Sequence, residues 1–205
     1  MRKKKYGVFV LVALCVLFGI SCISFHGVSS VTYSLYVEEA SSTTEGTLTL
    51  SFLPYEAGKQ KVSLACSLDG EEFSTTFTTS EENWSSAFLS VLFAQPAFAA
   101  FLGPIMTSQS MYIVLFAVTK GNLEEGFLWK EKDEEGREVT ISIPSKEIRF
   151  GREAFWIEMQ TEGKDTLKML IEKETLIPFV VDVSDKEESK RIHLEAKTIT
   201  WKESN

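Results

Sequence analysis

Cysteine and histidine are scarce in this chain of 205 residues. It has three cysteines, and of these only Cys66 lies outside the first 30 residues. A single cysteine excludes an intrachain disulfide and a cysteine-rich zinc site in the rest of the chain. Cys66 alternates with Val62, Leu64 and Leu68, so we interpret it as a small buried hydrophobic residue rather than a reactive thiol.

Enzymatic motifs are also lacking. The two histidines are His26, in the N-terminal region, and His193, which alternates outward in a strand-like segment. Neither has the spacing of a metal site such as HExxH, and no GxSxG, phosphate-binding loop or CxxC occurs. Acidic pairs such as Glu71 and Glu72 lie at turns and strand ends, where solvated charges are expected. We therefore predict a protein that is not an enzyme and has no cofactor or metal.

Positive charge is limited outside the N-terminus. Residues 1–30 hold four basic residues and no acidic ones, so the remainder carries 17 Lys and Arg against 29 Asp and Glu, a formal net charge of −12. No arginine occurs between Val31 and Lys120. An acidic surface repels phosphate backbones, which argues against nucleic acid as a partner.

The N-terminus has the pattern of an export segment. Residues 2–5 are basic, and residues 7–25 are uncharged and mostly apolar. This pattern directs a chain out of the cytoplasm while the basic end stays inside. We expect a periplasmic protein or one anchored to the outer face of the cytoplasmic membrane, and we set residues 1–30 apart as a signal peptide or membrane anchor.

Three fates of this segment remain open. Small residues at Val28 and Ser30 suit cleavage after Ser30. Lipidation at Cys22 is an alternative, although Gly19 stands where a larger aliphatic residue is usual. Retention is the third, because residues 6–25 are long enough to span a bilayer as a helix of about 20 residues. Retention would make the membrane itself a partner.

Charge is absent from a long central run. Residues 83–119 contain no charged side chain. Ser80 as N-cap and the acidic residues after it predict a helix start, Pro96 predicts a kink or a second helix, and Gly103–Pro104 predicts a break. A helix that is apolar on all sides is buried on more than one side. The run is therefore a core helix, a helix lining a ligand cavity, or a membrane span.

Short alternating segments lie on both sides of this run. Before it, four antiparallel strands are predicted around residues 33–37, 48–52, 62–68 and 73–77, with a hairpin turn at Asp69–Gly70. After it, six more are predicted, with turns that include Pro144–Ser145, at residues 127–130, 139–143, 155–160, 167–172, 178–182 and 192–201. Since about ten antiparallel strands rarely stay flat, we expect one curled sheet in an α+β domain covering residues 31–205.

One phrase in the second group of strands resembles a known superfamily. Residues 167–178, LKMLIEKETLIP, are followed directly by the strand-like segment FVVDVSD. A strand that ends in a charged pair, a Thr and a short turn to Pro is similar to the periplasmic lipoprotein carriers of the LolA-like superfamily, here at Ile171, Lys173, Glu174, Thr175 and Pro178. The resemblance implies an incomplete barrel, or half-barrel, whose apolar hollow is covered by helices and holds acyl chains.

These observations predict a curved sheet wrapped around a central helical insertion at residues 83–119. The predicted function is binding of an apolar ligand, such as a lipid or a lipoprotein acyl chain, in the cell envelope. The alternative is a structural or membrane-anchored envelope interaction module with no ligand cavity; the sequence identifies no protein partner. The predicted ligand-binding residues are those of the insertion and the sheet residues facing it: Trp84, Phe88, Leu92, Phe93, Phe98, Phe101, Met106, Trp129, Trp156 and Met159.

Overall fold

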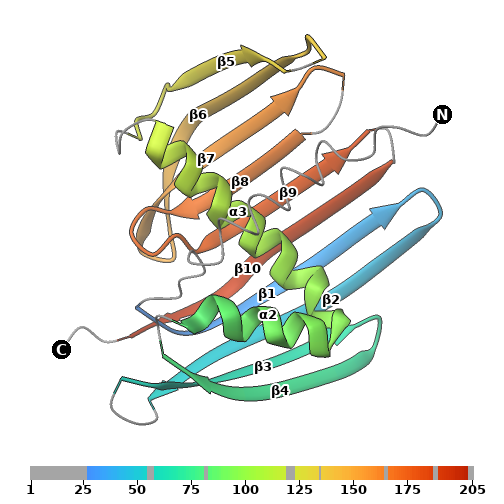
Figure 1. Ribbon diagram of the computed structural model, residues 1–205, viewed down its shortest axis with the longest axis vertical. Coiled ribbons are helices and arrows are strands. Elements are labelled where there is room, and N and C mark those ends of the chain that lie inside the picture. The colour runs from blue at the N-terminus through green and yellow to red at the C-terminus, as the bar shows by residue number, and fades with distance from the viewer. Residues whose placement is uncertain are drawn as a thin grey trace.

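A single antiparallel sheet dominates the molecule. The computed structural model describes residues 27–54, 58–80, 83–118, 123–133, 135–163, 166–186 and 189–202. Within them, ten strands are hydrogen-bonded in the order β4-β3-β2-β1-β10-β9-β8-β7-β6-β5, and the sheet curves without closing (Figure 1). The curved, open, ten-stranded antiparallel sheet expected from the sequence is confirmed.

The first half of the sheet is a meander. Its strands are β1 (Val28–Glu39), β2 (Ser42–Pro54), β3 (Gln60–Leu68) and β4 (Glu71–Thr79). The β3–β4 turn has Asp69 at φ 51° and Gly70 at φ 84°. Two consecutive positive φ angles are what a tight two-residue hairpin requires, and Asp-Gly is a preferred pair there. The predicted hairpin is confirmed.

The second half is another meander. Each of the six predicted segments is a strand: β5 (Leu128–Lys132), β6 (Glu138–Arg149), β7 (Arg152–Thr161), β8 (Thr166–Glu172), β9 (Pro178–Asp185) and β10 (Lys190–Trp201). The two meanders are joined by the pairing of β1 with β10, so strands from opposite ends of the chain are neighbours in the middle of the sheet. This long-range pairing has no signal in the local sequence.

The predicted turn at Pro144–Ser145 is wrong. Strand β6 continues through both residues to Arg149, and its pairing with β7 shifts register between Ser142 and Ser145. Proline has no N–H to donate to the hydrogen bonds between strands. Within a sheet it is therefore found at edge strands or at bulges and register shifts such as this one. The actual turn lies at Phe150–Gly151, both at positive φ.

The longer hairpin reaches the outer face of the sheet, which is the face that carries neither of the described α-helices. There the Arg149 guanidinium donates to the Glu195 carboxylate on β10, and the Phe150 ring packs edge-on against Phe179 at 5.2 Å between centroids. The Trp201 Nε1 donates to the Phe150 carbonyl oxygen at 2.9 Å. These contacts fix the hairpin tip beside β9 and β10.

Strand β1 begins inside the segment set apart above. The Val28 side chain is fully buried, and the Lys202 N–H donates to the Gly27 carbonyl oxygen at 2.8 Å. Cleavage after Ser30 stays a prediction, and it would remove the first residues of β1. Residues 1–26, with the expected signal or anchor helix and Cys22, lie outside the described residues.

Helices occupy the uncharged run. Helix α2 (Trp84–Ala94) begins after the N-cap residue Asn83 rather than after Ser80. Gln95 is extended, and the short 3₁₀ helix η3 (Pro96–Phe98) leads into helix α3 (Ala99–Val118). Both α-helices lie across one face of the sheet, here called the inner face (Figure 1). Among the described residues, no helix has the length and apolarity to span a bilayer.

The predicted break at Gly103–Pro104 is wrong, because α3 is continuous through both residues. Pro104 removes only one helical hydrogen bond, the one to the Ala100 carbonyl oxygen. Proline also disfavours helical backbone in the preceding residue by contact with its Cβ. Gly103 has no Cβ, and apart from its chain neighbours and the backbone of α3 no atom lies within 4 Å of where one would be. The helix accommodates the proline at this open position.

Candidate functional site

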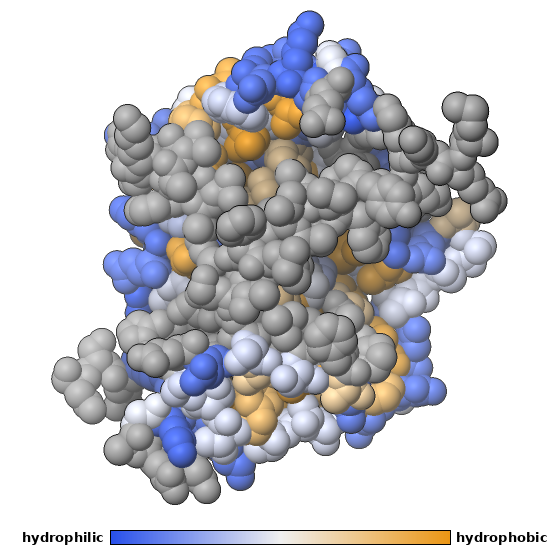
Figure 2. All heavy atoms as spheres, in the orientation of Figure 1, coloured by the Kyte–Doolittle hydropathy of each residue, from blue (hydrophilic) through white to orange (hydrophobic). Residues whose placement is uncertain are grey.

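The inner face of the sheet is apolar across seven strands. Direct cross-strand partners from β5 to β1 form one row, here called the inner row: Trp129, Ile141, Met159, Leu167, Val183, Ile192 and Val37. Apart from Leu167, which is buried, each of these side chains is only partly buried. Hydrophobic surface is visible between hydrophilic residues on this side of the molecule (Figure 2).

Helix α2 covers the sheet at β3 and β4. The Phe88 ring packs edge-on against the Phe77 ring of β4, with 5.6 Å between centroids and 84° between planes. Phe88 is buried, and so is Val62 of β3, the cross-strand partner of Phe77. This aromatic pair holds α2 at the end of the sheet where the inner face is already apolar.

Helix α3 spans the middle of the sheet. Near its start, the Phe101 ring sits over Gly46 of β2, where an added Cβ would lie 2.8 Å from the ring and 2.5 Å from the Ser67 carbonyl oxygen. Further along, the Tyr112 hydroxyl donates to the Lys173 carbonyl oxygen in the β8–β9 turn at 3.3 Å. Burial first, and then the negative charge of Glu172, raise the pKa of Tyr112 to about 12.

A cleft opens between α2 and β4. Its volume is about 310 Å³, and its lining is mostly apolar or hydroxyl-bearing: Thr75, Phe77, Thr78, Ala87, Ser90, Val91, Ala94 and Gln95. The Gln95 side-chain oxygen is buried and has no hydrogen-bond partner in the described part of the chain. The cleft therefore combines an apolar body with an unsatisfied acceptor at the end of α2.

Four of the predicted insertion residues are core residues. Phe88, Phe98, Phe101 and Met106 are buried in one hydrophobic cluster with the inner face. Trp84, Leu92 and Phe93 lie on α2, and their side chains are outside the described set. The structure thus brings these four helical residues together above the sheet. Both interpretations of the helical run, a helix lining a ligand cavity and a plain core helix, require this arrangement.

The three predicted sheet residues divide between the faces. Trp129 and Met159 belong to the inner row. Trp156 lies on the outer face, because successive strand residues point to opposite sides. Its Nε1 donates to the Glu147 carboxylate at 3.2 Å.

None of the residues that line the cleft is among the ligand-binding residues predicted from the sequence. Ala87, Ser90 and Val91 share one face of α2, and Thr75 and Phe77 share one face of β4. Their spacing follows the helical and strand periods, so the sequence indicates which of these residues share a face. The spacing does not indicate which face of the helix packs against which strand.

The outer face is charged. Asp182 on β9 accepts hydrogen bonds from Arg191 Nε at 3.1 Å and Nη2 at 2.5 Å, and its Oδ2 lies 3.1 Å from His193 Nδ1. Partial burial raises the pKa of Asp182, but the bonds from Arg191 and His193 outweigh it and hold that pKa below its usual range. A polar depression of about 440 Å³ adjoins this group, lined by Thr166, Lys168, Asp182, Ser184 and Arg191.

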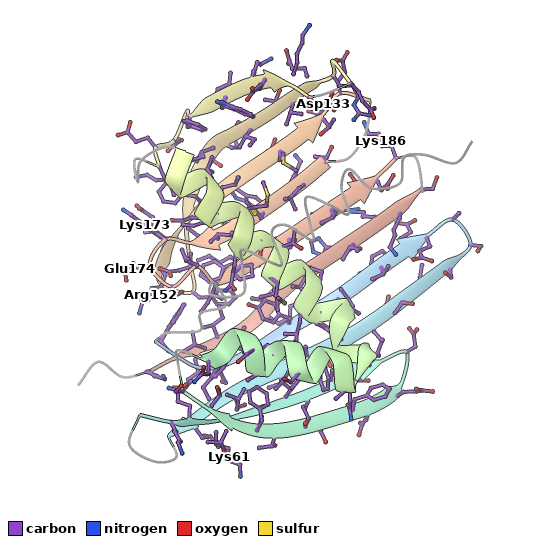
Figure 3. The ribbon with its side chains drawn as sticks, viewed as in Figure 1. Lys61, Asp133, Arg152, Lys173, Glu174 and Lys186 are labelled. Carbon is purple, nitrogen blue, oxygen red and sulfur yellow. The ribbon has the colours of Figure 1, made fainter. Side chains whose placement is uncertain are left out.

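Another ionic group lies at the β8–β9 turn. Arg152 is paired with Glu174 at 2.8 Å, and Lys173 with Glu153 at 3.3 Å, and Figure 3 shows Arg152, Lys173 and Glu174 gathered there. In the part of the chain that the structure describes, no group of three His, Cys, Asp or Glu residues is placed to hold a metal ion. Paired surface charges of this kind are typical of a solvated face.

Comparison with known proteins gives a loose likeness. No family model and no curated protein matches the chain. A solved structure of MucB in complex with MucA(peri) is 9% identical with a TM-score of 0.41, covering 95% of this chain and 56% of that one. This chain therefore spans little more than half of the MucB chain.

Two further structures align over nearly their whole length. A putative outer membrane lipoprotein-sorting protein domain from Vibrio parahaemolyticus is 10% identical with a TM-score of 0.24, covering 96% of this chain and 93% of that one. A LolA superfamily protein from Nitrosomonas europaea is 6% identical with a TM-score of 0.21, covering 94% of each chain. These likenesses are of general form, and no residue's role is carried over.

Proposed function

We propose that this protein binds an apolar ligand, such as a lipid or a lipoprotein acyl chain, between its helices and the inner face of its sheet. The cleft between α2 and β4 is the observation that carries the proposal. A filled interior would favour a purely structural protein, whereas a cleft of about 310 Å³ beside the apolar core leaves room for a hydrocarbon chain.

The lining suits an amphiphile. Phe77, Ala87 and Val91 supply apolar walls, and burial of apolar surface contributes about 25 cal/mol per Å². Thr75 and Thr78 bring hydroxyl groups to the same cleft. A polar head group or ester would be oriented by these hydroxyls, while the chain itself gains affinity without strong length selectivity.

The inner row supports the same function. Its partly buried side chains, including Trp129 and Met159, extend the apolar face toward β5. Partly exposed apolar side chains in a contiguous row are characteristic of a surface that is covered when a ligand or partner binds. The predicted helical residues Phe98, Phe101 and Met106 are buried in the core and do not line the cleft, so in this proposal they support the helices rather than contact the ligand.

We place this binding outside the cytoplasmic membrane, because residues 1–30 have the pattern of an export segment. The alternative role, an envelope interaction module held by residues 6–25, needs an uncleaved N-terminus. N-terminal sequencing of the purified protein separates the two, since a start near residue 27 or 31 excludes the anchor.

The test is a titration with dansyl-labelled undecanoic acid, a fluorescent fatty acid. Ala87→Trp fills the cleft and should raise Kd about tenfold or more, a loss of about 1.4 kcal/mol or more. Ser86→Trp places the same side chain at an exposed position of α2 that does not line the cleft, and it should leave Kd unchanged. The proposal is wrong if a folded Ala87→Trp protein binds the probe as wild type does.

A further inference from the structure

One edge of the sheet lacks the usual protection. Among the described strands β4 pairs only with β3, so the backbone groups along its other side have no ladder partner. In the part of the chain that the structure describes, no helix or strand lies beyond β4 at its edge of the sheet (Figure 1). From Phe73 to Thr79 the strand has no charge and no proline, and its register with β3 has no bulge.

The opposite edge is different. Strand β5 has five residues, and three of them are Lys130, Glu131 and Lys132. Lys130 is paired with Glu138 on β6 at 2.6 Å. Short length and charged side chains are the devices by which proteins prevent edge strands from pairing with other chains. The sheet therefore has one protected edge and one edge open to strand addition.

We propose that β4 pairs antiparallel with β4 of a second copy of this chain, about a two-fold axis at Thr75. Thr75 is the middle residue of β4, so this register pairs the strand along its full length. On the inner face, Phe73 then lies opposite Phe77 of the second copy. Aromatic cross-strand pairs stabilise antiparallel sheets. On the outer face, Ser74 lies opposite Thr76 of the second copy.

Charge complementarity favours a second copy as the occupant. Glu71 and Glu72 stand at the start of β4, and Lys61 on β3 is the partner of Thr78 near its end. Lys61 projects at this edge of the sheet (Figure 3). An antiparallel pair places Glu72 opposite Thr78 of the second copy, one strand from that copy's Lys61. Two strand spacings are about 10 Å, which two long side chains can bridge.

The experiment is sedimentation velocity on purified protein over a wide concentration range, with detergent if the N-terminal segment is retained. Wild type should show a concentration-dependent species of twice the single-chain mass. Ser74→Lys/Thr76→Lys sets Lys opposite Lys at the axis and should be monomeric. Ser74→Lys/Thr76→Glu sets Lys opposite Glu in the same register and should remain dimeric.

Thr47→Lys is the matched control. Thr47 is exposed on the same outer face but lies on β2, inside the sheet, so this variant should dimerise as wild type does. Circular dichroism melting checks that each variant is folded, and the single variant Thr76→Lys replaces the double one if that fails to fold.

Three results would overturn the inference: wild type that is monomeric at every concentration, a Lys/Lys variant that still dimerises, or a folded Lys/Glu variant that does not. A monomer that takes up the fatty acid probe would leave the proposed function standing, because the two measurements are independent.

Discussion

At the scale of single residues, two buried tyrosines differ in hydrogen bonding. Tyr33 lies on β1 with its side chain fully buried, and its hydroxyl has no partner in the described part of the chain. Burial raises the pKa of Tyr33 strongly, so the hydroxyl stays neutral. Tyr112 is buried as well, but its hydroxyl donates to the Lys173 carbonyl oxygen.

This difference predicts opposite effects of one substitution. An unpaired buried hydroxyl costs about 1–3 kcal/mol in desolvation, whereas a hydrogen bond contributes about 1 kcal/mol. Tyr33→Phe should therefore raise the free energy of unfolding by about 1 kcal/mol, and Tyr112→Phe should lower it by about 1 kcal/mol. Chemical denaturation of the two variants and wild type measures both. A loss of stability in Tyr33→Phe would show that its hydroxyl has a partner, such as a bound ligand.

Residue-level reasoning succeeded where burial follows alternation. Cys66 is buried as predicted, and burial raises the pKa of its thiol, which fits an unreactive side chain. The same alternation separates Trp156 from Met159, which lie on opposite faces although both were expected to face the insertion.

At the scale of elements, the strands were predictable because alternation and turn residues are local signals. The effects of the prolines on the strands and helices were not predictable, because they depend on the neighbouring strand or on the preceding turn of the helix. Pro144 was read as a turn, yet it sits at a register shift inside β6. Pro104 was read as a helix break, yet it follows a glycine inside α3. In both cases the neighbouring backbone removes the clash that the sequence alone suggests.

The position of Pro104 gives a prediction for helix α3. Pro104→Ala restores a donor to the Ala100 carbonyl oxygen and should raise the free energy of unfolding by about 1–3 kcal/mol. Pro96→Ala is the matched control, because Pro96 is the first residue of η3, where its N–H would have no helical partner. It should change stability by less than about 0.5 kcal/mol. Thermal and chemical unfolding measure both variants.

The opposite result is equally informative. If Pro104→Ala destabilises the protein, the proline maintains a bend that α3 needs in order to pack on the sheet, and our account of an accommodated proline is wrong.

At the scale of the whole molecule, the chain sorts its residues by face. Apolar residues gather between the helices and the inner face, and ion pairs such as Arg191–Asp182 and Lys168–Glu158 lie on the outer face. The sequence predicts this sorting strand by strand. It does not predict the pairing of β1 with β10, which brings residues more than 160 positions apart into contact, as Ser34 and Glu195 show.

That pairing also decides the shape of the site. Because β1 and β10 meet in the centre of the sheet, both edges are formed by strands adjoining the helical segment, β4 before it and β5 after it. The helices can then cross the inner face from one edge region toward the other. The cleft lies where α2 meets the edge strand β4, and its lining comes from residues close in sequence on either side of residue 80.

The most direct test of the account is native mass spectrometry of the protein purified from its own cells, followed by organic extraction. We predict a species heavier than the polypeptide by the mass of a lipid or acyl-bearing molecule, which is released by extraction and is much reduced in Ala87→Trp. A spectrum that shows only the bare polypeptide, together with a protein that takes up no added fatty acid, would contradict the central claim that the space between helices and sheet holds an apolar ligand.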